Sequence, residues 1–230
     1  MDLLENEMSN PLDHWYYFEK FRLLSENFDK HADRFRKVAD IGAGSALFSR
    51  ELAKRYPELD FIAVDINYTQ SQLLNSKGNL TFVRHVPSAD YYILTDVLEH
   101  IEDEELFLRE IVAKANPGAL FFITVPALQI LWSGHDVFLR HFRRYSRSGL
   151  KCLVNSSELI EINTNYLFFI LFPIAFVVRR LKKSQETRSQ MRTVNPVLNC
   201  ILRKLNSFEN LIHFRKPFGV SLYCIAKKAK

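Results

Sequence analysis

The stretch VADIGAGSALFSREL, residues 38–52, joins a short apolar run to a helix-like run through two glycines. The apolar run 38–41 is typical of a buried strand, and a helix is expected after the second glycine. Gly42 and Gly44 allow the chain to turn sharply and its backbone to approach a ligand closely. The stretch therefore predicts a strand–turn–helix unit that holds a nucleotide-like ligand.

The same alternation continues on both sides of this stretch. Short apolar strands between amphipathic helices are typical of a parallel sheet covered on both faces, with ligands at the carboxyl ends of the strands. The connection HVPSA, residues 85–89, is too short for an ordinary crossover helix, so either that helix is missing or the third strand is irregular. The expected strands are 38–41, 60–65, 80–84, 91–96 and 119–125, and the expected helices are 46–56, 69–76 and 103–115.

The pattern changes after residue 126. A helix near 148–155 and a strand near 158–165 are followed by the apolar run YLFFILFPIAFVV, residues 166–178, and by the basic run RRLKKS. A polar linker should extend to residue 193, a helix should run from Pro196 to about 211, and a strand should end the chain. With 230 residues, 47% of them hydrophobic, we expect one domain with an insertion.

The glycine turn does not match the common phosphate-binding motifs. A dinucleotide fingerprint needs a third glycine at position 47, which is Leu47, and the chain has no GxxxxGK[ST] string. Asp40, two residues before Gly42, would repel a pyrophosphate. Asp65, 21 residues after Gly44, can accept hydrogen bonds from ribose hydroxyls. A ribose acceptor beside a turn that disfavours phosphate indicates a site for S-adenosylmethionine.

Four segments within residues 36–127 resemble the motifs of class I S-adenosylmethionine-dependent methyltransferases: VADIGAGSALF, FIAVDI, ADYYILTDVLEHIEDEELFLREI and NPGALFFITVPA. The third looks like the small-molecule and lipid branch. The segments DHWYYFEKFRLL, LWSGHDVFLRHFRRYS and RKPFGVSLYCIAKK are similar to a less characterised bacterial subfamily.

This resemblance implies an α/β fold, with a Rossmann-like, seven-stranded, mostly parallel sheet flanked by helices. The last strand, about 220–227, would lie antiparallel between strands five and six. The expected organisation is a helical cap (1–35), a cofactor-binding core (36–165), an apolar and basic insertion (166–218) and the final strand (219–230).

The resemblance also implies a cofactor site. Asp40 would lie near the amino-acid end of S-adenosylmethionine, Asp65 would bind the ribose and Ile66 would flank the adenine. The usual third glycine is replaced by Ala46, and the residue that contacts the adenine amine stays open because the segment RHVPSAD is short. The full expected set is Asp40, Gly42, Gly44, Asp65, Ile66, Asp96 and Val97.

Methyl transfer from a sulfonium is an in-line displacement that needs a general base only for a protonated acceptor. The segment HDVFLRHFRRY, residues 135–145, supplies the candidates. We expect His141 to be the base, oriented by Asp136, with His135 as a further candidate. A structural ion-pair network of Asp136 with Arg143 and Arg144, with His141 as a hydrogen-bonded structural residue, remains an alternative.

Acceptor recognition is expected from two parts of the chain. An aromatic N-terminal helix should close over the pocket, although core packing explains its aromatic residues equally well. Guanidinium groups would suit an anionic acceptor. The expected acceptor-binding residues are Trp15, Tyr16, His100, Arg143 and Tyr145, and Glu99 is expected to cap a helix.

Other classes of function are less well supported by the sequence. Cys152, Cys200 and Cys224 are far apart and form no CxxC pair or His/Cys cluster, so neither a metal site nor a disulfide framework is expected. The acidic start of the chain is unlike a secretory signal, which favours a cytoplasmic protein. A nucleic-acid methyltransferase is the alternative enzyme class. It is less well supported, because this chain has DVLEH where base N-methyltransferases of this fold carry an Asn/Asp-Pro-Pro-aromatic string. A non-catalytic binding scaffold is disfavoured by the complete set of cofactor acids.

The charge of the chain is divided unevenly. Residues 1–175 carry 18 Lys and Arg against 24 Asp and Glu, whereas residues 176–230 carry 13 against 2. An apolar run beside a cationic cluster is typical of a segment that lies in the headgroup layer of an anionic membrane. We therefore expect residues 166–183 to contact the inner membrane face, with burial in the domain or a dimer interface as alternatives.

Overall fold

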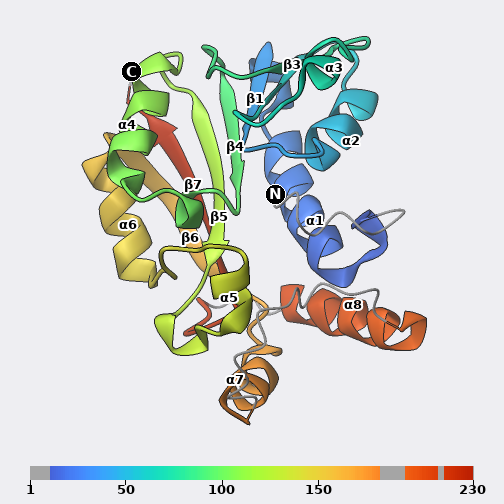
Figure 1. Ribbon diagram of the computed structural model, residues 1–230, viewed down its shortest axis with the longest axis vertical. Coiled ribbons are helices and arrows are strands. Elements are labelled where there is room, and N and C mark those ends of the chain that lie inside the picture. Colours follow the sequence, from blue (N-terminus) through green and yellow to red (C-terminus); the bar gives the residue numbers. More distant parts are fainter. Residues whose placement is uncertain (1–10, 182–194, 212–214, 230) are drawn as a thin grey trace.

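The computed structural model describes residues 11–181, 195–211 and 215–229, and its centre is a seven-stranded sheet with the order β3-β2-β1-β4-β5-β7-β6 (Figure 1). The strands are β1 (Lys37–Ile41), β2 (Asp60–Val64), β3 (Leu80–Val83), β4 (Tyr91–Thr95), β5 (Leu120–Pro126), β6 (Leu159–Leu167) and β7 (Ser221–Lys228). The helices are α1 (Trp15–Asp29), α2 (Leu47–Arg55), α3 (Gln70–Leu73), α4 (Glu104–Lys114), α5 (Gly134–Phe138), α6 (Arg147–Ser156), α7 (Phe172–Leu181) and α8 (Pro196–Asn210).

Helices cover both faces of the sheet, as the sequence predicts. Figure 1 shows α4 and α6 on one side of the strands and α1 and α2 on the other. Buried residues of α4 and α6, such as Leu108 and Leu150, pack with Phe121 of β5, whereas Leu24 of α1 and Leu52 of α2 join the core of the opposite face. β4 and β5 are buried along their whole length, which explains why both strands are mostly apolar.

The order and direction of the strands confirm the expected fold. Strands β1 to β5 pair in parallel, and β7 pairs antiparallel with both β5 and β6. The chain passes from β3 to β4 without a helix, as the short connection indicates. Tyr92 holds this connection, because its hydroxyl donates to the Pro87 carbonyl at 2.8 Å and accepts from the Ala89 N–H at 3.0 Å.

The apolar run 166–178 does not form one continuous helix. Tyr166 and Leu167 end β6, and Phe168 and Leu171 are buried in a cluster with residues of α1 and α8, so the expected insertion begins inside a strand. Only the second half of the run becomes helix α7. No helix among the described residues has the length and apolar character needed to span a membrane. The expected polar linker up to residue 193 lies outside the described residues.

Helix α8 packs against α1, and both α7 and α8 lie at the lower end of the view in Figure 1. Asn199 of α8 accepts from the Trp15 N–H at 2.9 Å and donates to the Asp13 carbonyl at 2.7 Å. Asn210, the last residue of α8, donates to Glu19 of α1 at 3.0 Å. These bonds fix α8 along the N-terminal helix.

We predict that Gly219→Ala destabilises the fold by at least about 1–3 kcal/mol, the usual range for overpacking. A Cβ atom at Gly219 would lie 2.3 Å from the carbonyl oxygen of Leu167 and 2.8 Å from Cβ of Tyr166, at the point where β7 approaches β6. Urea denaturation measures the change.

Gly149→Ala in α6 is the control, since its nearest neighbour would be the Ser146 hydroxyl at 3.2 Å. Alanine also favours a helix over glycine there, so its effect should be below about 1 kcal/mol. Equal stability of the Gly219→Ala protein and the wild type would contradict the close packing of β6 and β7.

Candidate active site

The glycine turn begins directly after β1 and requires glycine at its first position. Gly42 has φ +65° and Gly44 has φ +54°, a backbone region that side chains rarely adopt. A Cβ atom at Gly42 would lie 2.8 Å from a methyl group of Val97, which follows β4. The structure therefore brings Gly42 and Val97, two of the expected cofactor residues, into direct contact.

Asp65, at the end of β2, holds the same turn from the neighbouring strand. One carboxylate oxygen accepts from the Gly44 N–H at 3.0 Å, and the other accepts from the Asn67 N–H at 2.9 Å. Ile66 beside it is 79% exposed. A carboxylate with further acceptor capacity and an exposed apolar side chain thus lie together at the carboxyl edge of the sheet.

Asp40 lies within β1 and is buried. Its carboxylate accepts a hydrogen bond from the Ser49 hydroxyl of α2. Burial raises the pKa of Asp40 from its ordinary value of 3.8 to about 6, and the hydrogen bond from Ser49 opposes only part of this shift. Asp40 is therefore a carboxyl group whose ionisation the fold disfavours.

Asp96, at the end of β4, is paired with a residue that the sequence analysis did not identify. Lys20 of α1 is fully buried and donates to both carboxylate oxygens of Asp96 and, at 2.6 Å, to the Tyr16 hydroxyl. Burial opposes ionisation of Asp96, but the charge and hydrogen bonds of Lys20 outweigh burial and lower its pKa. Asp96 also has φ +53°, a strained conformation that is common at functional sites.

The sequence does contain a signal for Lys20. Lys20, Leu24 and Phe28 follow one another at the spacing of one helix face, and all three are buried. A lone cation on an otherwise apolar face indicates a buried partner of opposite charge.

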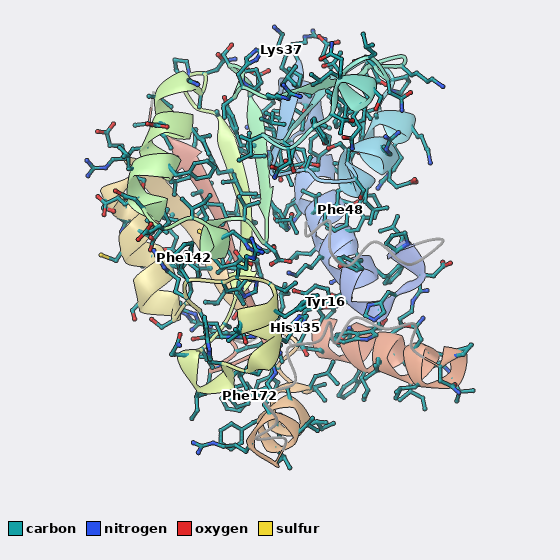
Figure 2. All side chains as sticks on the ribbon, viewed as in Figure 1. Tyr16, Lys37, Phe48, His135, Phe142 and Phe172 are labelled. Atoms are coloured by element: carbon teal, nitrogen blue, oxygen red, sulfur yellow. The ribbon has the colours of Figure 1, made fainter. Side chains whose placement is uncertain are left out.

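A small pocket lies beside this ion pair. Its volume is about 80 Å³, and α1, the end of β4, α5 and the loop after α5 all contribute to its walls. Figure 2 shows Tyr16 of α1 close to His135 of α5, at the position of this pocket. The residues that line it are Tyr16, Tyr17, Asp96, Glu99, His100, Pro126, His135, Leu139, His141, Arg144, Arg179, Val220 and Ser221.

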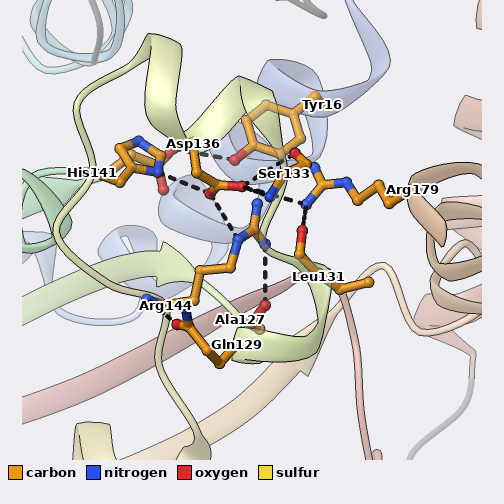
Figure 3. Close-up of polar contacts among 10 residues, drawn as sticks. Tyr16, Ala127, Gln129, Leu131, Ser133, Asp136, His141, Arg144 and Arg179 are labelled. Carbon is orange, nitrogen blue, oxygen red and sulfur yellow. Dashed lines mark hydrogen bonds and ion pairs between the residues drawn. The ribbon is translucent and has the colours of Figure 1, made fainter. Parts of the chain in front are cut away.

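Asp136 organises one wall of the pocket (Figure 3). Its fully buried carboxylate binds His141 Nδ1 at 3.1 Å and Arg144 Nε at 2.7 Å, and it accepts from the Ser133 N–H at 2.9 Å. Burial raises the pKa of Asp136, but the hydrogen bond from His141 and the charge of Arg144 outweigh burial and hold the pKa well below its ordinary value. The expected pairing of Asp136 with His141 is therefore present, and of the alternative network the pairing of Asp136 with Arg144 is present.

Arg179 of α7 points toward the same carboxylate, contrary to its expected place in an exposed cationic cluster. Its Nη1 lies 3.9 Å from Asp136 and donates to the Leu131 carbonyl. Burial lowers the pKa of Arg179 to about 10. Lys182 and Lys183 of that cluster lie outside the described residues.

Three residues expected to bind the acceptor do not line the pocket. Arg143 pairs with Glu104 and donates to the Glu102 carbonyl at 2.7 Å. Tyr145 is buried in the core beneath β5, and Trp15 packs edge-to-face on Phe168.

Tyr16 and His100 do line the pocket, together with the candidate catalytic residues His135 and His141, and Asp136 lies behind His141 and Arg144. Glu99 also lies there, at 1% exposure, so its prediction as a helix cap is wrong. The cap of α4 is Asp103, which accepts from the Leu106 N–H at 3.0 Å.

A family model described as a methyltransferase domain matches residues 12–163. The chain belongs to this methyltransferase family. The match spans the cap helix, the glycine turn and the Asp136–His141 pair.

Solved structures share the fold of this methyltransferase at low sequence identity. A putative sarcosine dimethylglycine methyltransferase from Galdieria sulphuraria is 14% identical over 92% of this chain and 86% of that one, with a TM-score of 0.59. An S-adenosylmethionine-dependent methyltransferase from Archaeoglobus fulgidus is 21% identical over 93% and 100%, with a TM-score of 0.50.

A third structure contains bound molecules. It is the 1,6-didemethyltoxoflavin-N1-methyltransferase of Burkholderia thailandensis, solved with 1,6-didemethyltoxoflavin and S-adenosylhomocysteine; it is 14% identical over 92% and 79%, with a TM-score of 0.55. The search of curated proteins gives no match. The family match and the fold identify a class I methyltransferase, a class whose cofactor is S-adenosylmethionine.

We predict that Asp40→Asn stabilises the methyltransferase more at pH 8 than at pH 5. The pKa of Asp40 is about 6 in the folded state and 3.8 ordinarily, so the wild type loses stability as the pH rises from about 3.8 to about 6. The asparagine does not ionise, and its gain in stability over the wild type should be about 1.4 kcal/mol larger at pH 8 than at pH 5. Urea denaturation at both pH values tests this; an equal effect at pH 5 and pH 8 would show that Asp40 does not titrate in this range.

Proposed function

We propose that this methyltransferase transfers the methyl group of S-adenosylmethionine to an oxygen or nitrogen atom of a small-molecule, lipid-linked or glycan acceptor. The observation that carries the proposal is the pocket at the carboxyl end of β4. His141, which is held by Asp136, lines this pocket together with Asp96. The Burkholderia methyltransferase, which was crystallised with 1,6-didemethyltoxoflavin, supports a small-molecule acceptor.

The cofactor would lie across the carboxyl ends of β1, β2 and β4. The two oxygens of Asp65 would accept the ribose hydroxyls, and exposed Ile66 would cover one face of the adenine. A Cβ atom at Gly42 would collide with Val97, so the turn beside the proposed cofactor site requires glycine at this position. Asp40 and Asp96 would lie near the amino-acid end of the cofactor.

His141 is the residue we propose for activation of the acceptor. Its Nδ1 is engaged with Asp136, which directs the other ring nitrogen, Nε2, away from this carboxylate and makes it the atom that meets the acceptor. His135 is less suitable as a base, because burial lowers its pKa to about 4. General-base catalysis contributes about 10²–10⁴-fold, and alignment of acceptor and methyl group contributes roughly 7–11 kcal/mol.

Asp65→Ala should weaken the binding of S-adenosylhomocysteine by about 1.5–3 kcal/mol for each lost hydrogen bond. Titration calorimetry measures this directly. Asp60→Ala is the matched control, because Asp60 begins the same strand at the opposite edge of the sheet and is exposed. Unchanged affinity in the Asp65→Ala protein would remove Asp65 from the cofactor site.

The acceptor class requires a second measurement. Cell extract incubated with the enzyme and methyl-labelled S-adenosylmethionine should yield label in a small-molecule, lipid or glycan fraction. The Asp65→Ala protein should give less label at a limiting concentration of S-adenosylmethionine. Label confined to nucleic acid would exclude the proposed acceptor classes.

We further propose that α7 and α8 contact the cytoplasmic face of an anionic membrane. Six apolar side chains of these two helices are at least 49% exposed. Arg180 of α7 and Lys204 of α8 are exposed cations on the same helices. Those apolar side chains are Ile174 and Val177 of α7, and Val197, Leu198, Ile201 and Phe208 of α8. At 10 residues α7 is about 15 Å long, so it would lie in the interface and not cross it.

Liposome flotation at low salt tests the membrane proposal. Phe169 and Phe172 pack against Phe218 with tilted rings and are poor probes, whereas Ile174 and Val177 are exposed. The wild type should float with anionic vesicles, and a protein with Ile174→Ser and Val177→Ser should float several-fold less. A wild type that stays in the soluble fraction would exclude membrane contact.

A further inference from the structure

Three side chains that can bind a metal ion meet in the acceptor pocket. One ligand atom each from Glu99, His100 and His141 lies within 4.8 Å of the other two. The two imidazole rings are arranged edge to face, with their centroids 4.6 Å apart. In a tetrahedral site with bonds of about 2.0–2.1 Å, ligand atoms are roughly 3.3 Å apart, so small side-chain rotations would close this set around an ion.

Glu99 gives an independent indication of a ligand. Its side chain is 1% exposed, and its Oε2 atom has no hydrogen-bond partner within the part of the chain that the structure describes. A buried carboxylate oxygen without a donor is unfavourable, because its hydration is lost and not replaced. A cation in the pocket would supply the missing interaction.

The contact between His141 and Asp136 completes the pattern. Histidines that bind metals usually donate their second ring N–H to a carboxylate, which fixes the tautomer and directs the other nitrogen at the ion. Asp136 holds Nδ1 of His141 at 3.1 Å in this way and is itself fixed by Arg144 at 2.7 Å. His141 is therefore oriented before any ion arrives.

We propose that Glu99, His100 and His141 bind a divalent transition-metal ion, with Zn²⁺ as the best match to two imidazoles and one carboxylate. Two histidines and a glutamate are a known ligand set for catalytic zinc, which leaves a coordination position open. An oxygen of the acceptor would take that position, so the acceptor class is a compound with a hydroxyl group.

The metal would supply the acidity that the reaction needs. A hydroxyl bound to it loses its proton to solvent at neutral pH, as metal-bound water does. The oxygen lone pair then forms the bond to the methyl carbon while the carbon–sulfur bond breaks, and its electron pair stays on the sulfur of S-adenosylhomocysteine. This inference rests on the proposed function and refines the role of His141 in it. A metal-bound Nε2 has no lone pair left to accept a proton, so His141 would act as a metal ligand and not as the general base.

Titration of the metal-free protein with Co²⁺, followed by the d–d absorption of the bound ion, tests the site. The wild type should bind one ion per chain, and Zn²⁺ should displace it. His100→Ala, His141→Ala and the isosteric Glu99→Gln should each weaken binding at least about 100-fold, and Asp136→Asn should weaken it about 10–100-fold. His85→Ala, which removes an exposed histidine outside the pocket, should have no effect.

Each protein is also titrated with S-adenosylhomocysteine, which shows that the variant is folded. The inference is overturned if folded wild type binds Co²⁺ no more tightly than folded His100→Ala or Glu99→Gln protein. In that case S-adenosylhomocysteine would still bind, and the proposed function would stand. Tight Co²⁺ binding without any binding of S-adenosylhomocysteine would instead refute the proposed function.

Methyl transfer separates the metal from a simple base. If His141 acts alone as the base, transfer by the wild type to the labelled acceptor is insensitive to chelators. If the metal activates the acceptor, transfer by the wild type falls on chelation and returns with Zn²⁺.

Discussion

The arrangement of the site depends on one buried ion pair, between Lys20 of α1 and Asp96 at the end of β4. A lysine without solvent contact loses several kcal/mol of hydration, and only close partners make its burial tolerable. Both oxygens of Asp96 and the Tyr16 hydroxyl surround its ammonium group. Loss of one partner of such a pair costs about 3–5 kcal/mol, so the pair holds α1 firmly over the end of β4. Helix α1 therefore covers one side of the pocket.

The position of α1 limits the size of the molecule that the pocket can hold. Its volume is about 80 Å³. An acceptor that needs more room than this would have to displace α1 and so loosen the contact between Lys20 and Asp96. Helix α8 is hydrogen-bonded to α1 through Asn199 and Asn210. A displacement of α8 at a membrane would therefore also move α1.

The strands and the cofactor edge were predictable from the sequence, because both follow from local pattern. Alternating strand and helix runs predict a parallel sheet, and parallel strands bring Asp65 and Asp96 to one edge although they are 31 residues apart. The apolar run 166–178 was harder, since periodicity alone does not distinguish a buried strand end from a buried helix. The structure divides it between β6, the core and α7.

Side-chain partners from distant segments were the least predictable part. Arg179 looks like part of a basic run, but it points at Asp136, which is 43 residues earlier in the chain. Glu99 looks like a cap because an acidic helix start follows it, and only the fold shows that its side chain lies in the pocket. Local pattern contains no information about such contacts, because they are set by how the elements pack.

Asp136 explains why the acceptor pocket suits either a proton or a metal ion. Its pKa stays far below neutrality, so its carboxylate is charged whenever the enzyme works, and His141 keeps one fixed orientation. Both functions use the same lone pair on Nε2 of His141. What distinguishes them is the neighbourhood, since a base needs no second imidazole and no unpaired carboxylate beside it. The presence of His100 and Glu99 within 4.8 Å is therefore the feature that favours a metal ion over simple proton transfer.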